Sequence, residues 1–282
     1  MPKVIDAFRP APPEADEAFY AQFRAELQRF AREACPAPTR ALRAGGAKTP
    51  RAEWFVWQRR LHAAGSGAPG WPQAYGGTGW TLRQRLVFEE VMAQEDCPLQ
   101  YHHGLGHIGP VLIAFGTEAQ KQRFLPGILA GTEWWCQGFS EPGAGCDLGS
   151  LKTRAVAQGD HYLVSGQKIW TSHAHEADWI YALVRTSSEA RKQDGISMLL
   201  IRLDSPGVSV RPIRTIDGLQ YLNEVFFDEV RVPQDQRVGE EGQGWRIAKF
   251  LLERERLPPG AVARWTRLWQ RVARLVAEKA AA

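Results

Sequence analysis

The sequence lacks the features that mark membrane, secreted and zinc-binding proteins. It has no run of 18 apolar residues, so no segment is predicted to span a membrane. The first residues, MPKVIDAFRPAPPEADE, contain no apolar signal-peptide core, so we expect a cytoplasmic protein with no membrane partner. The four cysteines include no Cys-x-x-Cys pair, and the histidines have no nearby cysteine or carboxylate cluster. We therefore predict no metal site.

Neither sign of charge is in large excess. The chain has 35 Lys and Arg against 31 Asp and Glu in 282 residues, a net charge of +4. Arginine alternates with glutamate in stretches such as RAELQRFARE, a pattern typical of solvated helix faces. With no basic block and no nucleic-acid motif, no nucleic-acid partner is predicted. The 44% apolar content is that of a globular protein with one large domain or two.

The first 130 residues show helical periodicity. Four aromatic or aliphatic side chains repeat at spacings of four, four and three, which places them on one face of a helix. A Thr followed three residues later by Gln precedes two further stretches and predicts helices over 82–95 and 118–130. We therefore predict an N-terminal helical domain over 1–130. The stripe is Phe19, Phe23, Leu27 and Phe30, and the capping pairs are Thr81 with Gln84 and Thr117 with Gln120.

Near residue 131 the pattern changes to short β-rich segments. TRAVAQGDHYLVSGQKIW predicts a hairpin that turns at 158–160, and four more such segments follow without intervening helices. This cadence predicts an antiparallel sandwich or barrel over 131–238. From Gly244 the helical pattern returns, and Pro258 and Pro259 are expected to interrupt it. The fold class is therefore α+β multidomain, with 239–282 as the start of a C-terminal helical bundle.

The stretch CQGFSEPGAGCDLGS, residues 136–150, is the richest in glycine. Its GAGCDLG spacing is one residue off the dinucleotide fingerprint, and it precedes strands where that fingerprint opens a helix. A Rossmann site is therefore excluded, and a phosphate loop of the Walker type is absent. Taken alone, the stretch is a glycine-rich connection into a β-domain.

The wider sequence resembles the acyl-CoA dehydrogenase family. The resemblance runs from GWPQAYGGTGW and AFGTEAQKQRFLPGILAGTEWW, through CQGFSEPGAGCDLGSLKTRAV and GQKIWTSHAHEADWIYALVRT, to NEVFFDEVRVPQDQRVGEEGQGW and LLERERL. It covers nearly the whole chain in order. It implies an N-terminal helical domain, a middle β-domain and a C-terminal helical bundle, with FAD bound between the last two.

The resemblance also implies two flavin-facing segments. The first contains Gln137, Phe139 and Ser140, whose polar groups would hydrogen-bond the ring edge. The second contains Trp170, Thr171 and Ser172, with an indole to pack on the ring and hydroxyls for its polar edge. The alternative for Trp170 is an ordinary core tryptophan.

Gly145 and Cys146 match the glycine turn that lies near the flavin pyrophosphate and the substrate thioester in the family. The family usually has serine where this chain has Cys146, and a thiol is a weaker hydrogen-bond donor. Backbone amides of the turn would still bind phosphate. Cys146 is thus a candidate for both cofactor and substrate binding, and we do not interpret it as a redox nucleophile.

The implied reaction is α,β-dehydrogenation of an acyl-CoA thioester, with electrons passed on to an electron-transferring flavoprotein. Its base is a partly desolvated carboxylate. Some branches of the family place a glutamate on the first C-terminal helix, immediately before an arginine, and Glu255 matches that pattern. Glu253 competes, but two residues are about 200° of helix rotation, so only one can face the flavin. The alternative is that ERER is a solvated charge run.

Two other interpretations stay open at this stage. The chain is a non-catalytic or partner-dependent subunit of a heteromeric dehydrogenase, or it is an acyl-CoA oxidase or flavin monooxygenase with the same fold. The former follows from the length, because the family continues beyond the first C-terminal helices. The last helix also carries an apolar stripe, so we expect a truncated chain or a homo- or hetero-oligomer. The stripe is Trp265, Leu268, Val272 and Leu275.

Overall fold

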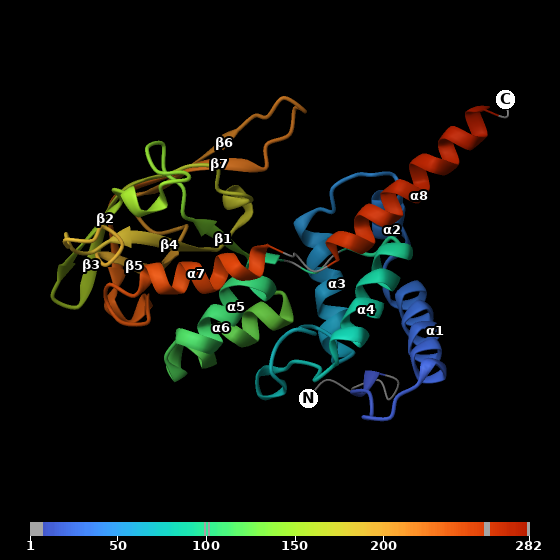
Figure 1. The fold of residues 1–282 in the computed structure, drawn as a ribbon. Coiled ribbons are helices and arrows are strands. Elements are labelled where there is room, and N and C mark those ends of the chain that lie inside the picture. The colour runs from blue at the N-terminus through green and yellow to red at the C-terminus, as the bar shows by residue number, and fades with distance from the viewer. Residues whose placement is uncertain (1–7, 99, 101, 257–259, 281–282) are drawn as a thin grey trace. The chain divides into compact units, whose positions relative to one another are not determined.

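The computed structural model describes residues 8–98, 100, 102–256 and 260–280. Their contacts divide the chain into two compact units that do not follow chain order. The first unit combines the described residues within 1–101, 129–131 and 257–282, and the second combines 102–128 with 132–256. Because these units are defined by packing, the predicted boundaries at 130 and 238 stay a prediction. Figure 1 shows the helices and strands in chain order.

The first unit is helical. Phe23 and Leu27, on the predicted stripe, are buried in its core, and Phe19 and Phe30 pack partly buried against the same core. Thr81 caps α4 as predicted, since its side chain and that of Gln84 exchange backbone hydrogen bonds. The helices of this unit are α1 (Glu17–Ala34), α2 (Ala37–Ala44), α3 (Arg51–Ala63), α4 (Leu82–Gln94) and α8 (Ala261–Ala280), with a 3₁₀ turn at Gln73–Tyr75.

The second unit is built on one eight-stranded sheet. The strand order is β6-β7-β3-β2-β4-β5-β8, and β1 pairs with β4. The two ends of this path do not pair, so the sheet is open and sandwich-like rather than a closed barrel. The strands are β1 (Trp135–Gly138), β2 (Arg154–Gln158), β3 (His161–Lys168), β4 (Trp179–Arg185), β5 (Ile196–Arg202), β6 (Val208–Ile213), β7 (Leu222–Pro233) and β8 (Arg237–Val238).

The predicted sandwich-like β-domain is confirmed, but its sheet is mixed rather than purely antiparallel. The predicted hairpin is confirmed, because β2 and β3 are antiparallel with a turn at 159–160. However, β4 pairs in parallel with both β1 and β2. The reason is that the chain leaves β1 through the glycine-rich stretch and leaves β3 through a further loop, so β4 lies beside strands that run in its own direction. β4 and β5 are apolar runs buried on both faces.

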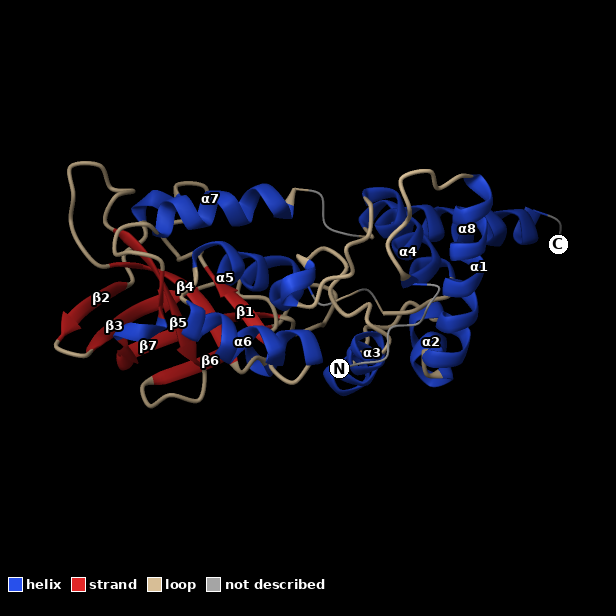
Figure 2. Ribbon diagram, turned by 90° about the horizontal axis from the view of Figure 1, so that it is seen from below, coloured by secondary structure: helices blue, strands red, loops and turns tan. Residues whose placement is uncertain are grey.

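Helices cover this sheet. α7 (Gly244–Glu255) contacts β4 and β5, and Figure 2 shows it on one side of the sheet. The predicted helix at 118–130 is α6 (Glu118–Ala130), opened by the Thr117 and Gln120 capping bonds. A π-helical turn at His102–Ile108 runs directly into α5 (Gly109–Phe115). Pro258 and Pro259 lie outside the described residues, so the predicted interruption is not tested. No helix in the described part of the chain is long and apolar enough to cross a bilayer.

Candidate active site

Glu255 is the last residue of α7 and lies in the second unit. Its side chain is 28% exposed, and Oε1 lies 3.4 Å from Nδ1 of His107. Burial raises the pKa of Glu255, and a hydrogen bond with the Gln137 side chain offsets part of that rise. Oε1 has no hydrogen-bond partner among the described residues. Glu253, two positions earlier, is exposed. The helix therefore turns one carboxyl inward and the other to solvent.

The Tyr181 hydroxyl connects the groups around Glu255. It lies 3.0 Å from Nδ1 of His107 and 3.1 Å from Nδ1 of His103, and it donates to Oε1 of Gln137 at 3.2 Å. Burial holds the pKa of Tyr181 well above its ordinary value, so the phenol stays neutral and acts as a hydrogen-bond donor. Gln137 thus lies between a neutral phenol and a carboxyl group.

The two histidines come from the π-helical turn ahead of α5. They are four residues apart, and their rings meet edge to face with centroids 5.1 Å apart. His107 is almost fully buried, whereas His103 is half-buried. π-helical turns widen a helix locally and occur often at functional sites. This turn places both imidazoles within hydrogen-bond distance of the Tyr181 hydroxyl.

The structure brings the two predicted flavin-facing segments together. Ile169 N donates to the Ser140 carbonyl at 3.0 Å, which joins the segment after β1 to the segment after β3. In the first segment Gln137 is half-buried, and Phe139 is buried with its ring edge-on to Tyr181, 6.1 Å between centroids. The first segment therefore also contacts Tyr181, one of the residues grouped around Glu255.

The second segment presents unusual side chains. Trp170 has a backbone φ of +60° yet an indole that is 57% exposed, so an unfavourable conformation displays a large aromatic ring to solvent. Thr171 is 1% exposed, and its Oγ1 has no hydrogen-bond partner among the described residues. The Thr171 N–H donates to the Asn223 carbonyl, and the Asn223 side-chain amide donates to the Thr171 carbonyl, which holds the segment in place. Ser172 is half-buried.

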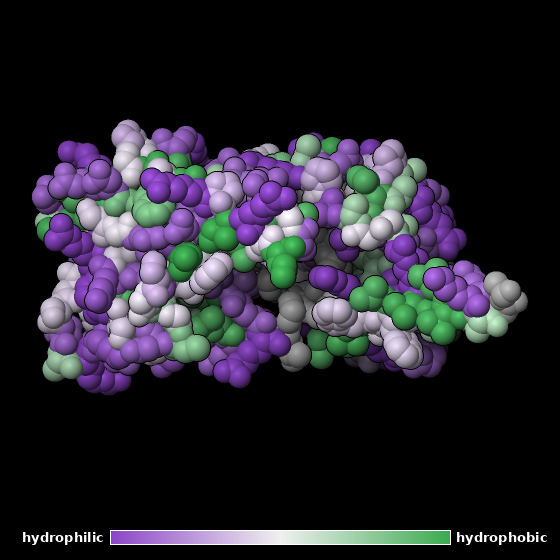
Figure 3. Space-filling view, turned by 90° about the horizontal axis from the view of Figure 1, so that it is seen from above, coloured by the Kyte–Doolittle hydropathy of each residue, from purple (hydrophilic) through white to green (hydrophobic). Residues whose placement is uncertain are grey.

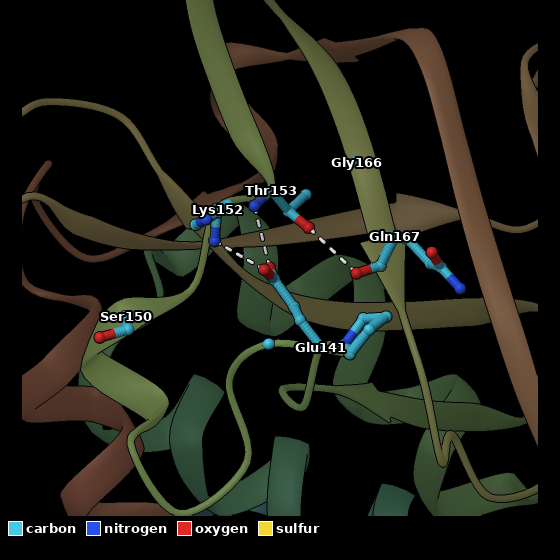
Figure 4. Close-up of a pocket in the computed structure, with 8 residues that line it drawn as sticks. Glu141, Ser150, Lys152, Thr153, Gly166 and Gln167 are labelled. Carbon is cyan, nitrogen blue, oxygen red and sulfur yellow. Dashed lines mark hydrogen bonds between the residues drawn. The ribbon is translucent and has the colours of Figure 1, made fainter.

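A buried ion pair braces these two segments. Lys168 Nζ lies 2.8 Å from Oε1 of Glu141 and donates to the Phe139 carbonyl at 3.2 Å. Glu141 also accepts from the backbone N–H groups of Lys152 and Thr153 (Figure 4). Burial alone would raise the pKa of Glu141, but Lys168 and these donors outweigh it, so the pKa is lowered and the carboxylate stays ionised. Burial lowers the pKa of Lys168 to about 8, against the attraction of Glu141.

The glycine turn is open. Gly145 and Cys146 are both exposed, and a Cβ built on Gly145 would meet no atom within 4 Å. A cavity of about 270 Å³ lies beside the start of the turn and next to the Glu141 bonds that Figure 4 shows. Neither Gly145 nor Cys146 lines it. Its lining residues are Glu141, Pro142, Gly143, Ser150, Lys152, Thr153, Gly166 and Gln167.

Sequence reasoning missed the polar groups that surround Glu255. His103, His107 and Tyr181 carried no motif, although the four-residue spacing of the histidines was a usable signal for one helix face. Tyr181 lay hidden in an apolar strand. In the part of the chain that the structure describes, no group of three or more His, Cys, Asp or Glu side chains is placed to hold a metal ion.

The chain belongs to the acyl-CoA dehydrogenase family, whose members are flavin-dependent. Residues 19–132 match the model of the acyl-CoA dehydrogenase N-terminal domain, and residues 136–230 match that of the middle domain. The first match spans α1 to α6, and the second spans β1 to β6 and most of β7.

Relatives and solved structures agree with this assignment. Acyl-CoA dehydrogenase IpdE1 of Mycobacterium tuberculosis is 44% identical over 240 residues, which cover 83% of this chain and 62% of that protein. Acyl-CoA dehydrogenase FadE29 of the same organism is 42% identical over 214 residues, covering 76% and 55%. The chain thus spans less than two thirds of these curated relatives.

Among solved structures, the Tcur3481-Tcur3483 steroid ACAD matches with a TM-score of 0.80 at 35% identity, covering 94% of this chain and 68% of that one. The ChsE4-ChsE5 complex from Mycobacterium tuberculosis matches with a TM-score of 0.72 at 34% identity, covering 86% and 61%.

Proposed function

We propose that this chain takes part in FAD-dependent α,β-dehydrogenation of an acyl-CoA thioester, with Glu255 as the base. The observation that carries the proposal is the inward carboxyl of Glu255. It is half-buried, its pKa is raised, and one oxygen has no hydrogen-bond partner among the described residues. A base with these properties accepts a proton more readily than an ordinary surface carboxylate does.

The residues of both segments fit a flavin. The exposed indole of Trp170 offers a flat apolar surface, and the buried Oγ1 of Thr171 is a polar atom still without a partner among the described residues. Gln137, Phe139 and Ser140 form the facing segment, and Gly145 and Cys146 offer open backbone for the pyrophosphate. Bound here, FAD would supply the hydride acceptor. The assigned cofactor contacts are Gln137, Phe139, Ser140, Gly145, Cys146, Trp170, Thr171 and Ser172.

The chain's own residues abstract the proton, orient the base and hold the cofactor and substrate. Glu255 takes the proton from the carbon alpha to the thioester carbonyl and holds it on a carboxyl oxygen. Gln137 orients that carboxyl through their shared hydrogen bond, and Tyr181 orients Gln137 in turn. The Lys168–Glu141 pair keeps the two cofactor segments at a set separation. We assign Cys146 to substrate binding beside the thioester.

The proposed partners are an acyl-CoA substrate, an electron-transferring flavoprotein and further subunits. Two solved relatives each carry the names of two proteins, one as the ChsE4-ChsE5 complex and the other as the Tcur3481-Tcur3483 steroid ACAD. α8 carries an exposed apolar stripe, as expected from the sequence, and Figure 3 shows hydrophobic side chains gathered along it. These observations support an assembly with a second chain and make a steroid acyl-CoA a useful member of a substrate panel.

The test compares Glu255→Gln with Glu253→Gln in the purified assembly, using absorbance of the flavin during mixing with a panel of acyl-CoA thioesters. We expect both variants to retain FAD. Glu255→Gln should slow flavin reduction by roughly a hundredfold or more, the usual scale for a positioned base, whereas Glu253→Gln should react at the normal rate.

Normal bleaching in Glu255→Gln would contradict the assignment of the base. Failure of the wild-type assembly to bind FAD would contradict the cofactor assignment. Release of hydrogen peroxide in place of electron transfer to the flavoprotein would make the protein an oxidase.

A further inference from the structure

The first unit contains an arginine-rich cleft outside the proposed active site. The cleft lies among the C-terminal end of α2, the end of α4 and residues 264–274 of α8, and its cavity volume is about 390 Å³. Five arginines line it, but only one carboxylate, that of Asp96. The arginines are Arg43, Arg264, Arg267, Arg271 and Arg274.

Local partners compensate little of this charge. Asp96 forms an ion pair with Arg267, whose Nη2 lies 2.8 Å from Oδ2 of the carboxylate. Arg271 donates to the carbonyl of Ala44, which is neutral and leaves the guanidinium charge in place. Arg264 lies 5.4 Å from the ring of its neighbour Trp265. Across the lining side chains, positive charge exceeds negative charge by four.

The guanidinium groups also repel one another electrostatically, and some of their N–H donors have no hydrogen-bond acceptor among the described residues. The pKa of Arg43 is lowered, first by burial and then by the nearby charge of Arg264. The Nε atoms of Arg43 and Arg267 are buried and have no hydrogen-bond partner among the described residues. Buried donors without acceptors cost free energy, and each such group in a native structure calls for an explanation such as an ion. An anion in the cleft would relieve both the repulsion and the missing acceptors.

We propose that this cleft binds the phosphate group of a small molecule. A phosphate dianion offers several acceptor oxygens to guanidinium forks, and arginine is the side chain best suited to that geometry. The cavity exceeds the size of one phosphate, and Ala93 and Leu268 give it an apolar wall. A phosphate carried by a nucleotide therefore fits as well as a free one. This inference does not depend on the proposed dehydrogenase activity.

The first test measures the unfolding midpoint of the protein during titration with sodium phosphate, against sodium chloride at matched ionic strength. We expect a saturable rise with phosphate only. Arg43→Met and the double variant Arg264→Gln/Arg274→Gln should weaken phosphate binding by roughly tenfold or more for each guanidinium removed. Arg29→Gln, which removes an exposed arginine of α1 outside the cleft, is the matched charge control and should respond like the wild type.

The double variant protects the test against a folding failure of Arg43→Met, because Arg264 and Arg274 are exposed. Equal stabilisation by chloride, or an unchanged phosphate response in the double variant, would overturn the proposal.

A second titration identifies the source of the phosphate. CoA and 3′-dephospho-CoA are compared in the wild type and in the double variant. CoA held only by the proposed active site would bind both proteins equally. A CoA preference that the double variant loses assigns the cleft to the nucleotide 3′-phosphate, whereas a response to inorganic phosphate alone assigns it to the free ion.

Discussion

Nδ1 of His107 lies 3.4 Å from Oε1 of Glu255, although 148 residues separate them in the chain. The imidazole is almost fully buried, so it is one of the few polar groups that solvates this carboxyl from the protein side. The other groups facing Glu255 are the amide of Gln137 and, through it, the hydroxyl of Tyr181. The protonation of Glu255 therefore depends on residues from three separate elements.

Replacing His107 with Phe should raise the pKa of Glu255 further. The substitution removes a polar neighbour and leaves the carboxylate less solvated, whichever charge the imidazole carries. We expect the acid limb of the pH profile for flavin reduction to move to higher pH, with a rate loss of about tenfold at neutral pH, where more of the base is protonated. His107→Asn retains a polar group and should restore part of the shift. An unchanged pH profile in His107→Phe would show that His107 only packs.

Glu255→Gln should stabilise the fold at neutral pH. The folded-state pKa of Glu255 is raised by burial, so the stability linked to this group is full below the ordinary carboxyl pKa of 4.5 and is lost as pH rises through the folded value. The neutral amide avoids that loss. Thermal midpoints of the wild type and the variant should therefore differ most near neutral pH and converge as the pH falls. Glu253→Gln is the control, and an equal gain in it would rule out this cause.

Lys168→Met should be strongly destabilising. It leaves Glu141 buried without its cation, and removal of one partner from a buried pair costs about 3–5 kcal/mol. Urea unfolding should show this loss as a lower midpoint. The double variant Lys168→Met/Glu141→Gln should recover part of it, because the buried charge is gone. If the double variant is as unstable as the sum of the single variants, the pair does not act as a unit.

Substituting the exposed stripe of α8 should reduce association with other chains. Trp265 is 60% exposed and Leu275 is 53% exposed, and apolar surface of this kind drives protein contacts. We expect Trp265→Gln/Leu275→Gln to lower the sedimentation coefficient of the assembled protein at a given concentration. Glu278→Gln, on the same helix but outside the stripe, is the control. Identical sedimentation of the wild type and the stripe variant would count against this face as a contact.

Local patterns in the sequence determined much of the fold. The Thr81–Gln84 and Thr117–Gln120 pairs placed the starts of two helices, because a capping box is complete within four residues. The turn after Gln158 placed the hairpin for the same reason, since its hydrogen bonds join neighbours in the chain. That Glu253 and Glu255 point in different directions follows from helix rotation alone.

Only the tertiary structure decided what surrounds those elements. The parallel neighbours of β4, the pairing of Lys168 with Glu141 and the approach of His107 to Glu255 all join residues distant in sequence. Each depends on how loops return the chain to the sheet, and periodicity within one element carries no information about that path. The arginine cleft likewise needs α2, the end of α4 and α8 to meet, because its five arginines come from α2 and α8, which are far apart in the sequence.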